Sequence, residues 1–285
     1  MRKKMIYISI ILLIFLAIIK YTDSADIEII PILTYHNIEP NPPMKRISYS
    51  IDDKKFENHI EYLKKKGYSA LSLDEFSFKI SNKNRKNKMK LSDQKDIMIT
   101  IDDGKKNNYL YALPVLKKYN TKANIFIIGH RLIDIDKDYM VREDIERMID
   151  SKLIEIGSHS YDLHYKNNKR AALEKKEDES HIDYNRRLRT DILKSKEILE
   201  KNFNIKINSF AYPYGIYNDE AIIELKKAGM DFAFTTEYGA FKNDGHSSNY
   251  KIQRINIDGL CSEKRLLLQI EFFKRLAVLK YKLNL

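Results

Sequence analysis

The chain has 285 residues and a formal net charge of +11, and its length suits one large domain or two small ones. Its lysines are scattered among Ile, Asn and Tyr, and its arginine cluster at 186–189 lies in a helix-like charged stretch, so we expect no nucleic-acid partner. The only cysteine, Cys261, excludes an intrachain disulfide, so the fold must depend on its apolar core.

The N-terminus has the pattern of an export signal. Basic residues at 2–4 precede an unbroken apolar run from Met5 to Ile19. This run is short for a membrane span, which takes about 20 residues, yet "DSAD" (23–26) is a poor cleavage site. A cleaved signal peptide and a retained membrane anchor both stay open for residues 1–25. We expect residues 26–285 to form one extracytoplasmic domain, either secreted and associated with the cell surface or anchored to the membrane.

Strand-like and helix-like segments alternate after the leader. The predicted strands lie at 27–38, 68–73, 97–101, 123–129, 154–160, 207–215, 231–236 and 250–257. The predicted helices lie at 52–67, 110–120, 142–151, 170–203, 219–229 and 263–285. Residues 79–96 have no apolar period and predict an exposed loop. This β–α alternation favours a parallel sheet with helices outside it, as a barrel or an open sheet.

Two of these helices carry further predictions. In the helix at 170–203, Ile192, Leu193, Ile198 and Leu199 mark one apolar face, and the charges predict a solvated face. The segment 263–285 has an apolar stripe flanked by basic residues, among them Lys274, which suits an anionic membrane surface or, alternatively, a last barrel helix packed on the sheet.

Two adjacent carboxylates, Asp102 and Asp103, end the predicted strand at 97–101. Active sites of α/β folds are built at the carboxyl ends of strands, so both residues are placed for chemistry. Successive strand residues point to opposite sides, however, so both reach one centre only if the backbone bends, and Gly104 permits such a bend. The alternative is that the aspartates cap the following helix or turn.

A second polar cluster, His159 and His164, ends the strand at 154–160. Residues five apart do not share one face of a regular helix, so a loop must turn these histidines together. Two histidines and one carboxylate form a ligand set for Zn²⁺ or a similar divalent ion, with a position left for water. A surface pair of histidines is the alternative, and the nearby aspartates disfavour it.

Three short motifs resemble those of the polysaccharide deacetylases, a nodulation-type carbohydrate esterase family. They are "TIDDG" (100–104), "HSYDLH" (159–164) and "FAYPYG" (210–215), within a likeness over roughly residues 30–260. The four-residue histidine gap resembles the branch of biofilm poly-β-1,6-N-acetyl-D-glucosamine deacetylases. The resemblance implies an α/β fold, a deformed, circularly permuted (β/α) barrel of about seven strands.

The resemblance also implies roles for the site residues. Asp102 is then the general base, and Asp103, His159 and His164 are the ligands of a divalent metal, with Zn²⁺ first and Co²⁺ or Ni²⁺ as alternatives. Amide hydrolysis also needs an acid across the site from Asp102, to protonate the departing amine. The general family takes its acid from a histidine late in the chain, where this sequence offers only His246. The biofilm branch has an early "YH", which this chain matches in "LTYHNI" (33–38), so His36 is the expected acid.

Two further segments complete the predicted site. The turn "YPYG", with Pro213 and Tyr214, is expected to aim the Tyr214 amide at the oxyanion, although an ordinary Pro-Gly turn is the alternative. A late strand carries Arg254, for which the sequence leaves open two roles, orienting Asp102 or forming a structural ion pair.

The predicted reaction is removal of acetyl groups from an N-acetylglucosamine polymer by a monomeric metal-dependent hydrolase, with poly-β-1,6-N-acetyl-D-glucosamine of the biofilm as the preferred substrate. Alternatives are the same reaction on peptidoglycan or chitin-type β-1,4 chains, an inactive surface glycan-binding protein, and a metal-dependent phosphoesterase. A phosphoesterase usually brings a second metal and more ligands than this sequence shows. Intact Asp and His motifs disfavour an inactive binding protein.

Overall fold

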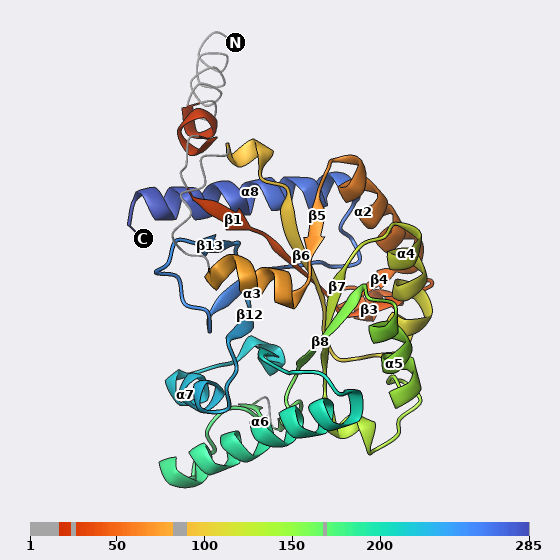
Figure 1. The fold of residues 1–285 in the computed structure, drawn as a ribbon, viewed down its shortest axis with the longest axis vertical. Helices are drawn as coiled ribbons and strands as arrows, with labels where there is room; N and C mark the ends of the chain where they lie inside the picture. Colours follow the sequence, from red (N-terminus) through yellow and green to blue (C-terminus); the bar gives the residue numbers. More distant parts are fainter. Residues whose placement is uncertain (1–16, 24–26, 82–89, 168–169, 285) are drawn as a thin grey trace.

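The computed structural model describes residues 17–23, 27–81, 90–167 and 170–284 (Figure 1). Most of the predicted leader lies outside these ranges, so its two alternatives stay predictions. None of the helices within the described ranges combines the length and apolar character that a membrane span requires. The short helical segment at 17–23 lies against the C-terminal helix, where Arg275 Nη1 donates to the Ile19 carbonyl and to Thr22 Oγ1 at 3.1 and 2.8 Å.

Seven parallel strands close into a barrel. In order around the barrel they are β2 (Ile32–Tyr35), β14 (Ile252–Asn256), β12 (Phe232–Tyr238), β11 (Ser209–Ala211), β8 (Ile154–Ser158), β7 (Ala123–Ile127) and β6 (Asp96–Ile101). The ring closes where β6 pairs with β2 along Met98–Ile101. A further strand, β5 (Ser69–Leu71), pairs with the first half of β6. The predicted deformed (β/α) barrel is therefore confirmed.

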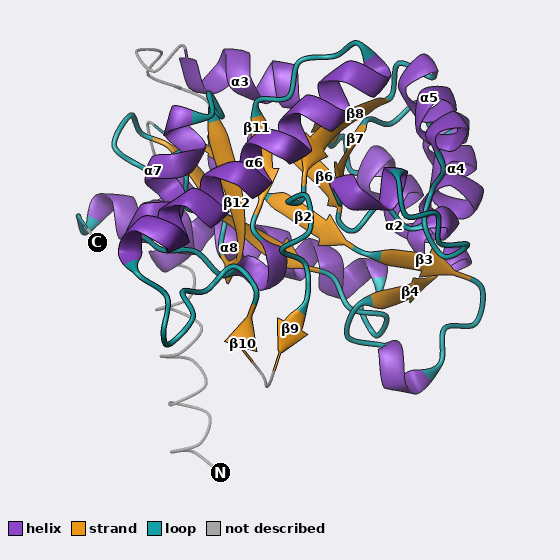
Figure 2. Cartoon of the chain, turned by 90° about the horizontal axis from the view of Figure 1, so that it is seen from below, coloured by secondary structure: helices purple, strands orange, loops and turns teal. Residues whose placement is uncertain are grey.

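The helices lie outside this ring (Figure 2). They are α2 (Asp53–Lys65), α3 (Leu73–Ser81), α4 (Leu113–Lys118), α5 (Arg142–Asp150), α6 (His181–Phe203), α7 (Asp219–Lys227) and α8 (Glu263–Lys282). Polar side chains cap five of them by accepting backbone N–H groups of the first turn, namely Asp52 for α2, Ser72 for α3, Ser180 for α6, Asn218 for α7 and Ser262 for α8. These caps explain where the helices begin.

Short strands and helical turns lie at the two ends of the barrel. Strand β1 (Glu28–Ile30) pairs antiparallel with β13 (Phe241–Asn243), β3 (Asn37–Glu39) pairs parallel with β4 (Ser50–Asp52), and β9 (Lys166–Asn167) pairs antiparallel with β10 (Arg170–Ala171). Short helical turns are η1 (Met44–Arg46), η2 (Leu91–Asp93), η3 (Asn108–Ala112), η4 (Gly129–Leu132) and η5 (Pro213–Gly215). The three-strand run β1, β2, β3 replaces the single strand predicted at 27–38.

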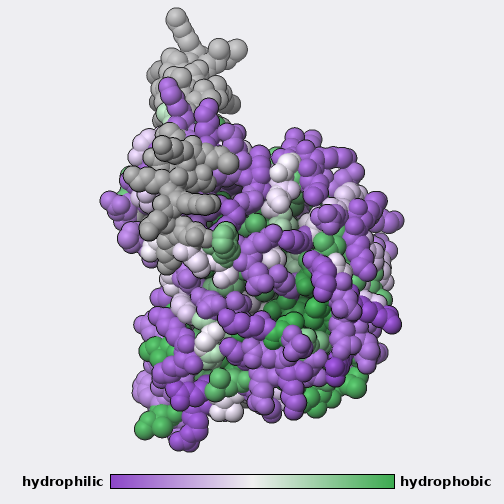
Figure 3. Space-filling model, viewed as in Figure 1, coloured by the Kyte–Doolittle hydropathy of each residue, from purple (hydrophilic) through white to green (hydrophobic). Residues whose placement is uncertain are grey.

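Aromatic rings fill part of the apolar core. Phe126 and Phe234 come from β7 and β12 with ring centroids 5.2 Å apart, and Phe76 of α3 packs against Phe232 at 5.5 Å. The guanidinium of Arg254 lies 6.0 Å from the Phe126 and Phe234 ring centroids. A charged residue therefore borders this aromatic layer. The outer surface in Figure 3 is mainly hydrophilic, with apolar areas between the charged side chains.

Two predicted segment boundaries are wrong in part. The exposed loop predicted at 79–96 overlaps the end of α3, and Ile80 and Leu91 are buried. The helix predicted from Arg170 begins only at His181, because Ser180 caps it. On the apolar face predicted for this helix, Ile192 and Leu199 are buried but Leu193 is exposed.

The predicted basic face of the C-terminal helix also needs correction. Lys274 is fully buried, and its Nζ donates to the carbonyls of Leu91 and Gln94, each at 2.8 Å. Helix α8 packs against β1, β13 and α2, and Ala277 and Val278 are buried. The helix is thus packed into the fold, on the β1–β13 pair and on α2, which agrees with the alternative prediction of a packed last helix.

Candidate active site

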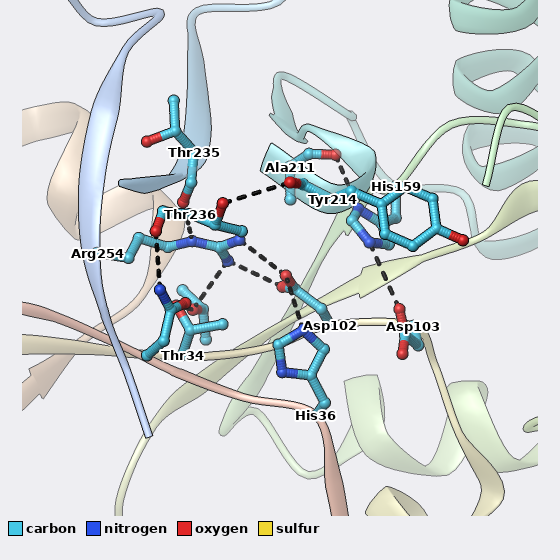
Figure 4. Close-up of polar contacts among 12 residues, drawn as sticks. Thr34, His36, Asp102, Asp103, His159, Ala211, Tyr214, Thr235, Thr236 and Arg254 are labelled. Carbon is cyan, nitrogen blue, oxygen red and sulfur yellow. Dashed lines mark hydrogen bonds and ion pairs between the residues drawn. The ribbon is translucent and has the colours of Figure 1, made fainter. Parts of the chain in front are cut away.

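A buried ion pair lies at the carboxyl end of the barrel. Asp102 follows β6 and is 1% exposed, and Arg254 of β14 is fully buried. Arg254 donates Nη1 to Oδ1 and Nη2 to Oδ2 of Asp102, at 2.9 and 2.8 Å (Figure 4). This two-point geometry fixes the plane of the carboxylate.

Arg254 is itself held by strand backbone and hydroxyl groups. Its Nε donates to the Thr235 carbonyl at 2.8 Å, and its Nη1 also donates to Thr100 Oγ1 at 3.2 Å. The Thr235 carbonyl becomes available where the register of β12 and β14 shifts, between Phe234 and Tyr238. Such irregularities often re-aim groups next to active sites.

The surroundings of Asp102 favour its charged form. Burial raises the pKa of this carboxyl, but the charges of Arg254, His159 and His36 and the hydrogen bonds from Arg254 together lower the pKa below its ordinary value. Asp102 is therefore an ionised carboxylate at neutral pH, able to accept a proton.

The two aspartates reach the same site because the chain bends between them. Asp103 has φ +76° and Gly104 has φ +70°, both in the left-handed region. A Cβ on Gly104 would lie 2.9 Å from Ile127 Cδ1, so glycine serves both the conformation and the close approach. The bend predicted from Gly104 thus begins one residue earlier, at Asp103.

Asp103, His159 and His164 form one cluster. Asp103 Oδ1 lies 3.5 Å from His159 Nε2 and 3.2 Å from His164 Nε2, and the two imidazole ring centroids are 4.6 Å apart. Burial raises the pKa of Asp103, but hydrogen bonds from both histidines and the charge of His36 hold it well below its usual range. The predicted loop between the histidines does bring them together.

The cluster fits a divalent ion. One donor atom from each of the three residues lies within 4.8 Å of the others. The second nitrogen of His159, Nδ1, lies 2.8 Å from the Ala211 carbonyl, which leaves Nε2 facing Asp103. Metal-bound histidines typically donate their other ring N–H to a carbonyl in this way. Two imidazoles and one carboxylate are also a donor set that suits zinc, with an open position.

His36 lies beside the base candidate, not across the site from it. It follows β2, its side chain is 25% exposed, and its Nε2 is 3.9 Å from Asp102 Oδ2. The ring therefore borders both Asp102 and solvent. The other candidate acid, His246, lies in the loop that leads into the start of β14, at the end of the barrel away from this site.

The turn at 213–215 forms a rim of the site. Tyr214 has φ +57°, and its ring stacks on His164 with centroids 4.8 Å apart. Pro213 is buried, and a Cβ on Gly215 would lie 1.9 Å from Thr236 Oγ1, so the backbone approaches β12 too closely for any other residue. The turn is more constrained than an ordinary Pro-Gly turn.

One buried polar residue near the site escaped prediction. Asp191 of α6 is 7% exposed, although its helix reads as a solvated charged face, and its carboxylate binds the loop between His159 and His164. The arginines at 186–189 make the segment around Asp191 read as a solvated charged helix, so its burial cannot be recognised from the sequence. A buried carboxylate in such a run carries no local signal.

The fold and the site together define a barrel hydrolase with an ionised carboxylate, a histidine and, at the same end, a cluster of three residues that could hold a cation. A family profile described as "Polysaccharide deacetylase" matches residues 90–233. The chain is 30% identical over 238 residues to a poly-β-1,6-N-acetyl-D-glucosamine N-deacetylase of Staphylococcus epidermidis, covering 78% of this chain and 77% of the relative. It is 32% identical over 215 residues to the protein of that name from Staphylococcus aureus, covering 74% and 68%.

A solved structure shares the fold. IcaB from Ammonifex degensii superposes with a TM-score of 0.71 at 23% identity, covering 85% of this chain and 97% of that one. The chain belongs to the polysaccharide deacetylase family, and it is a hydrolase acting on amide bonds.

Proposed function

We propose that this enzyme removes acetyl groups from poly-β-1,6-N-acetyl-D-glucosamine in biofilm and cell-surface polysaccharide, releasing acetate. The names of relatives at 30–32% identity support this substrate. The observation that carries the chemistry is the juxtaposition of Asp102, held by Arg254, with the Asp103–His159–His164 cluster at one end of the barrel.

Asp103, His159 and His164 would hold a divalent metal, Zn²⁺ first and Co²⁺ or Ni²⁺ as alternatives. When bound, such an ion supplies Lewis-acid chemistry, because it polarises a carbonyl and lowers the pKa of a coordinated water toward about 7. The contact of His159 Nδ1 with the Ala211 carbonyl would keep the ring turned so that Nε2 can bind the metal.

Asp102 acts as general base. Its ionised carboxylate, fixed by Arg254, accepts a proton from the water that attacks the acetyl carbonyl. The carbon–nitrogen bond of the resulting tetrahedral adduct then breaks, and the departing amine must gain a proton. His36, bordering both Asp102 and solvent, donates that proton. The products are acetate and a glucosamine unit.

The turn at Pro213 and Tyr214 binds the developing oxyanion. A backbone N–H aimed at the charge that forms in the transition state lowers the barrier without reorganisation, because its position is fixed beforehand. The left-handed Tyr214 and the close packing of Gly215 on Thr236 supply that fixed backbone. Tyr214 also stacks on His164, so this rim and the cation site support each other.

The test is acetate release by the purified chain from matched β-1,6 and β-1,4 N-acetylglucosamine oligomers, with Zn²⁺, Co²⁺ or Ni²⁺ added. We expect faster release from the β-1,6 oligomer. Asp102→Asn should retain tightly bound metal yet lose about 10²–10⁴ in turnover, whereas His164→Ala should lose the metal itself. Preference for the β-1,4 chain would assign the enzyme to peptidoglycan or chitin-type substrates, and wild-type turnover by Asp102→Asn would refute the base assignment.

We further propose that the enzyme works as a monomer outside the cytoplasm at the membrane surface. The export-type leader supports this location. On α8, Leu268 and Phe272 are 71% and 61% exposed, and Lys264 and Arg265 are also exposed. Exposed apolar and basic side chains on one helix favour an anionic lipid surface.

A further inference from the structure

The loop between His159 and His164 is short and turns sharply. Ser160 has φ +69°, in the left-handed region that non-glycine residues seldom adopt. Residues 160–163 leave β8 without continuing as a strand or helix, so their backbone N–H and carbonyl groups need partners from elsewhere in the fold. Those partners determine where His164 lies relative to His159.

One carboxylate binds three consecutive N–H groups of this loop. Asp191 Oδ1 accepts from Tyr161 N at 2.9 Å, and its Oδ2 accepts from Asp162 N at 2.7 Å and from Leu163 N at 3.2 Å. Leu163 immediately precedes His164. Asp191 therefore anchors the backbone up to the residue before the second histidine.

The carbonyl groups of the loop are bound by α6 and by η4. One turn further along α6, Ser195 Oγ donates to the Ser160 carbonyl at 3.1 Å and lies 2.7 Å from Ser158 Oγ. The N–H groups of Gly129 and His130 donate to the carbonyls of Ser160 and Tyr161, at 2.9 and 3.0 Å. The loop is thus clamped between α6 and η4.

Burying the Asp191 carboxylate in the middle of α6 costs desolvation free energy, so we ask what its hydrogen bonds achieve. Burial raises the pKa of Asp191 to about 6, although three backbone N–H groups donate to it and oppose that rise. A neutral side chain at this position would avoid the desolvation penalty. The Asp191 carboxylate instead accepts hydrogen bonds from the segment that joins the two histidines.

We propose that Asp191, assisted by Ser195, is a positioning residue that holds the 160–163 loop so that His164 meets His159 and Asp103, and thereby sets the metal affinity of the site. This inference rests on the proposed function, because it takes these three residues as the ligands. It requires no contact between Asp191 and the metal or substrate. Loss of the clamp should weaken metal binding while the barrel stays folded.

The test compares Asp191→Asn with a matched control, Glu224→Gln, in the full-length chain purified in mild detergent. Glu224 is also a buried carboxylate, on α7, where it pairs with Arg189 and Lys227 at 2.7 and 2.8 Å. Asparagine keeps the size of Asp191 but places an amide donor among N–H donors. Three readouts are taken for each protein: Co²⁺ affinity, the visible absorption of bound Co²⁺, and hydrogen exchange of the amides at 161–163.

We expect Asp191→Asn to raise the Kd for Co²⁺ about 10–100-fold, the usual effect of removing a supporting contact of a metal site. Its Co²⁺ absorption should change, and its 161–163 amides should exchange faster. Glu224→Gln should match the wild type in all three readouts. A folded Asp191→Asn with wild-type Co²⁺ affinity and spectrum would overturn the proposal, leaving Asp191 a stabilising residue only.

Two further variants keep the outcomes distinct. If Asp191→Asn does not fold, Ser195→Ala removes one bond of the same clamp and should still raise the Kd for Co²⁺ several-fold, so an unchanged Kd in that variant overturns the proposal. His164→Ala tests the ligand set itself. If it binds Co²⁺ as the wild type does, the proposed metal site is wrong, and that result is separate from a failure of the clamp.

Discussion

Replacing Arg254 with Met gives the sharpest test of the buried ion pair. The guanidinium is fully buried, and each of its two terminal nitrogens donates to an oxygen of Asp102. Met occupies similar space without a charge, so the variant leaves Asp102 buried without its partner. The stability and the activity of the enzyme should both respond, because the same carboxylate serves the fold and the reaction.

The size of the effect follows from burial. Removing one partner of a buried pair costs about 3–5 kcal/mol, because the remaining charge is desolvated and uncompensated. At about 2–4 °C per kcal/mol, Tm should fall by roughly 6–20 °C. Turnover should fall by about 10²–10⁴, since the base loses its orientation and its charged form is disfavoured.

Urea denaturation at pH 7 and acetate release measure the two effects. Arg189→Met is the control, since the Arg189 side chain is 50% exposed and its partner Glu224 keeps a second ion pair, with Lys227 at 2.8 Å. That change should cost less than about 1 kcal/mol. Adding Asp102→Asn to Arg254→Met should restore part of the lost stability by removing the unpaired charge, but no activity. An Arg254→Met variant that keeps its turnover and has a free energy of unfolding within 1 kcal/mol of the wild type, about one usual measurement error, would contradict this role of the ion pair.

Three further predictions concern other residues. His36→Ala should slow amide hydrolysis yet spare activated acetate esters, whose leaving groups need no proton; equal losses on both substrates would remove His36 from the acid role. Burial lowers the pKa of the His59 imidazole from 6.5 to about 4. The imidazole therefore binds a proton more strongly in the unfolded chain than in the folded one, and about 3 kcal/mol of stability is lost as the pH falls from 6.5 through 4. His59→Gln should flatten that part of the stability–pH profile, and an unchanged slope would contradict the assignment. Leu268→Glu combined with Phe272→Glu should reduce co-sedimentation with anionic vesicles without loss of folding, and unchanged binding would reject the membrane surface as a partner.

The packing of the C-terminal helix determines which variant can test membrane binding. Deleting residues 276–285 would test membrane binding directly, but Ala277 and Val278 are buried in an apolar cluster with Ile29 of β1. Such a deletion would remove core contacts, so lost vesicle binding could not be separated from lost folding. Substitutions of the exposed Leu268 and Phe272 avoid this difficulty.

The sequence by itself determined the strand–helix alternation and the chemistry-bearing motifs. These are local properties, since apolar periodicity, an Asp-Asp-Gly bend and a pair of histidines five residues apart depend on neighbouring residues only. Strand ends therefore pointed to Asp102, Asp103, His159 and His164 before any contact between them was known. Residue roles beyond this came from the family resemblance.

Tertiary structure alone decided which distant residues meet. Arg254 is 152 positions from Asp102, and only closure of the barrel through β14, β2 and β6 brings them to 2.8 Å. The same holds for Asp191, whose carboxylate in a charged helix looks solvated until α6 packs on the histidine loop. Lys274 turns inward for a similar reason, because two carbonyls on a remote segment accept hydrogen bonds from its ammonium group. Burial and long-range pairing depend on the closed fold, and no local pattern encodes them.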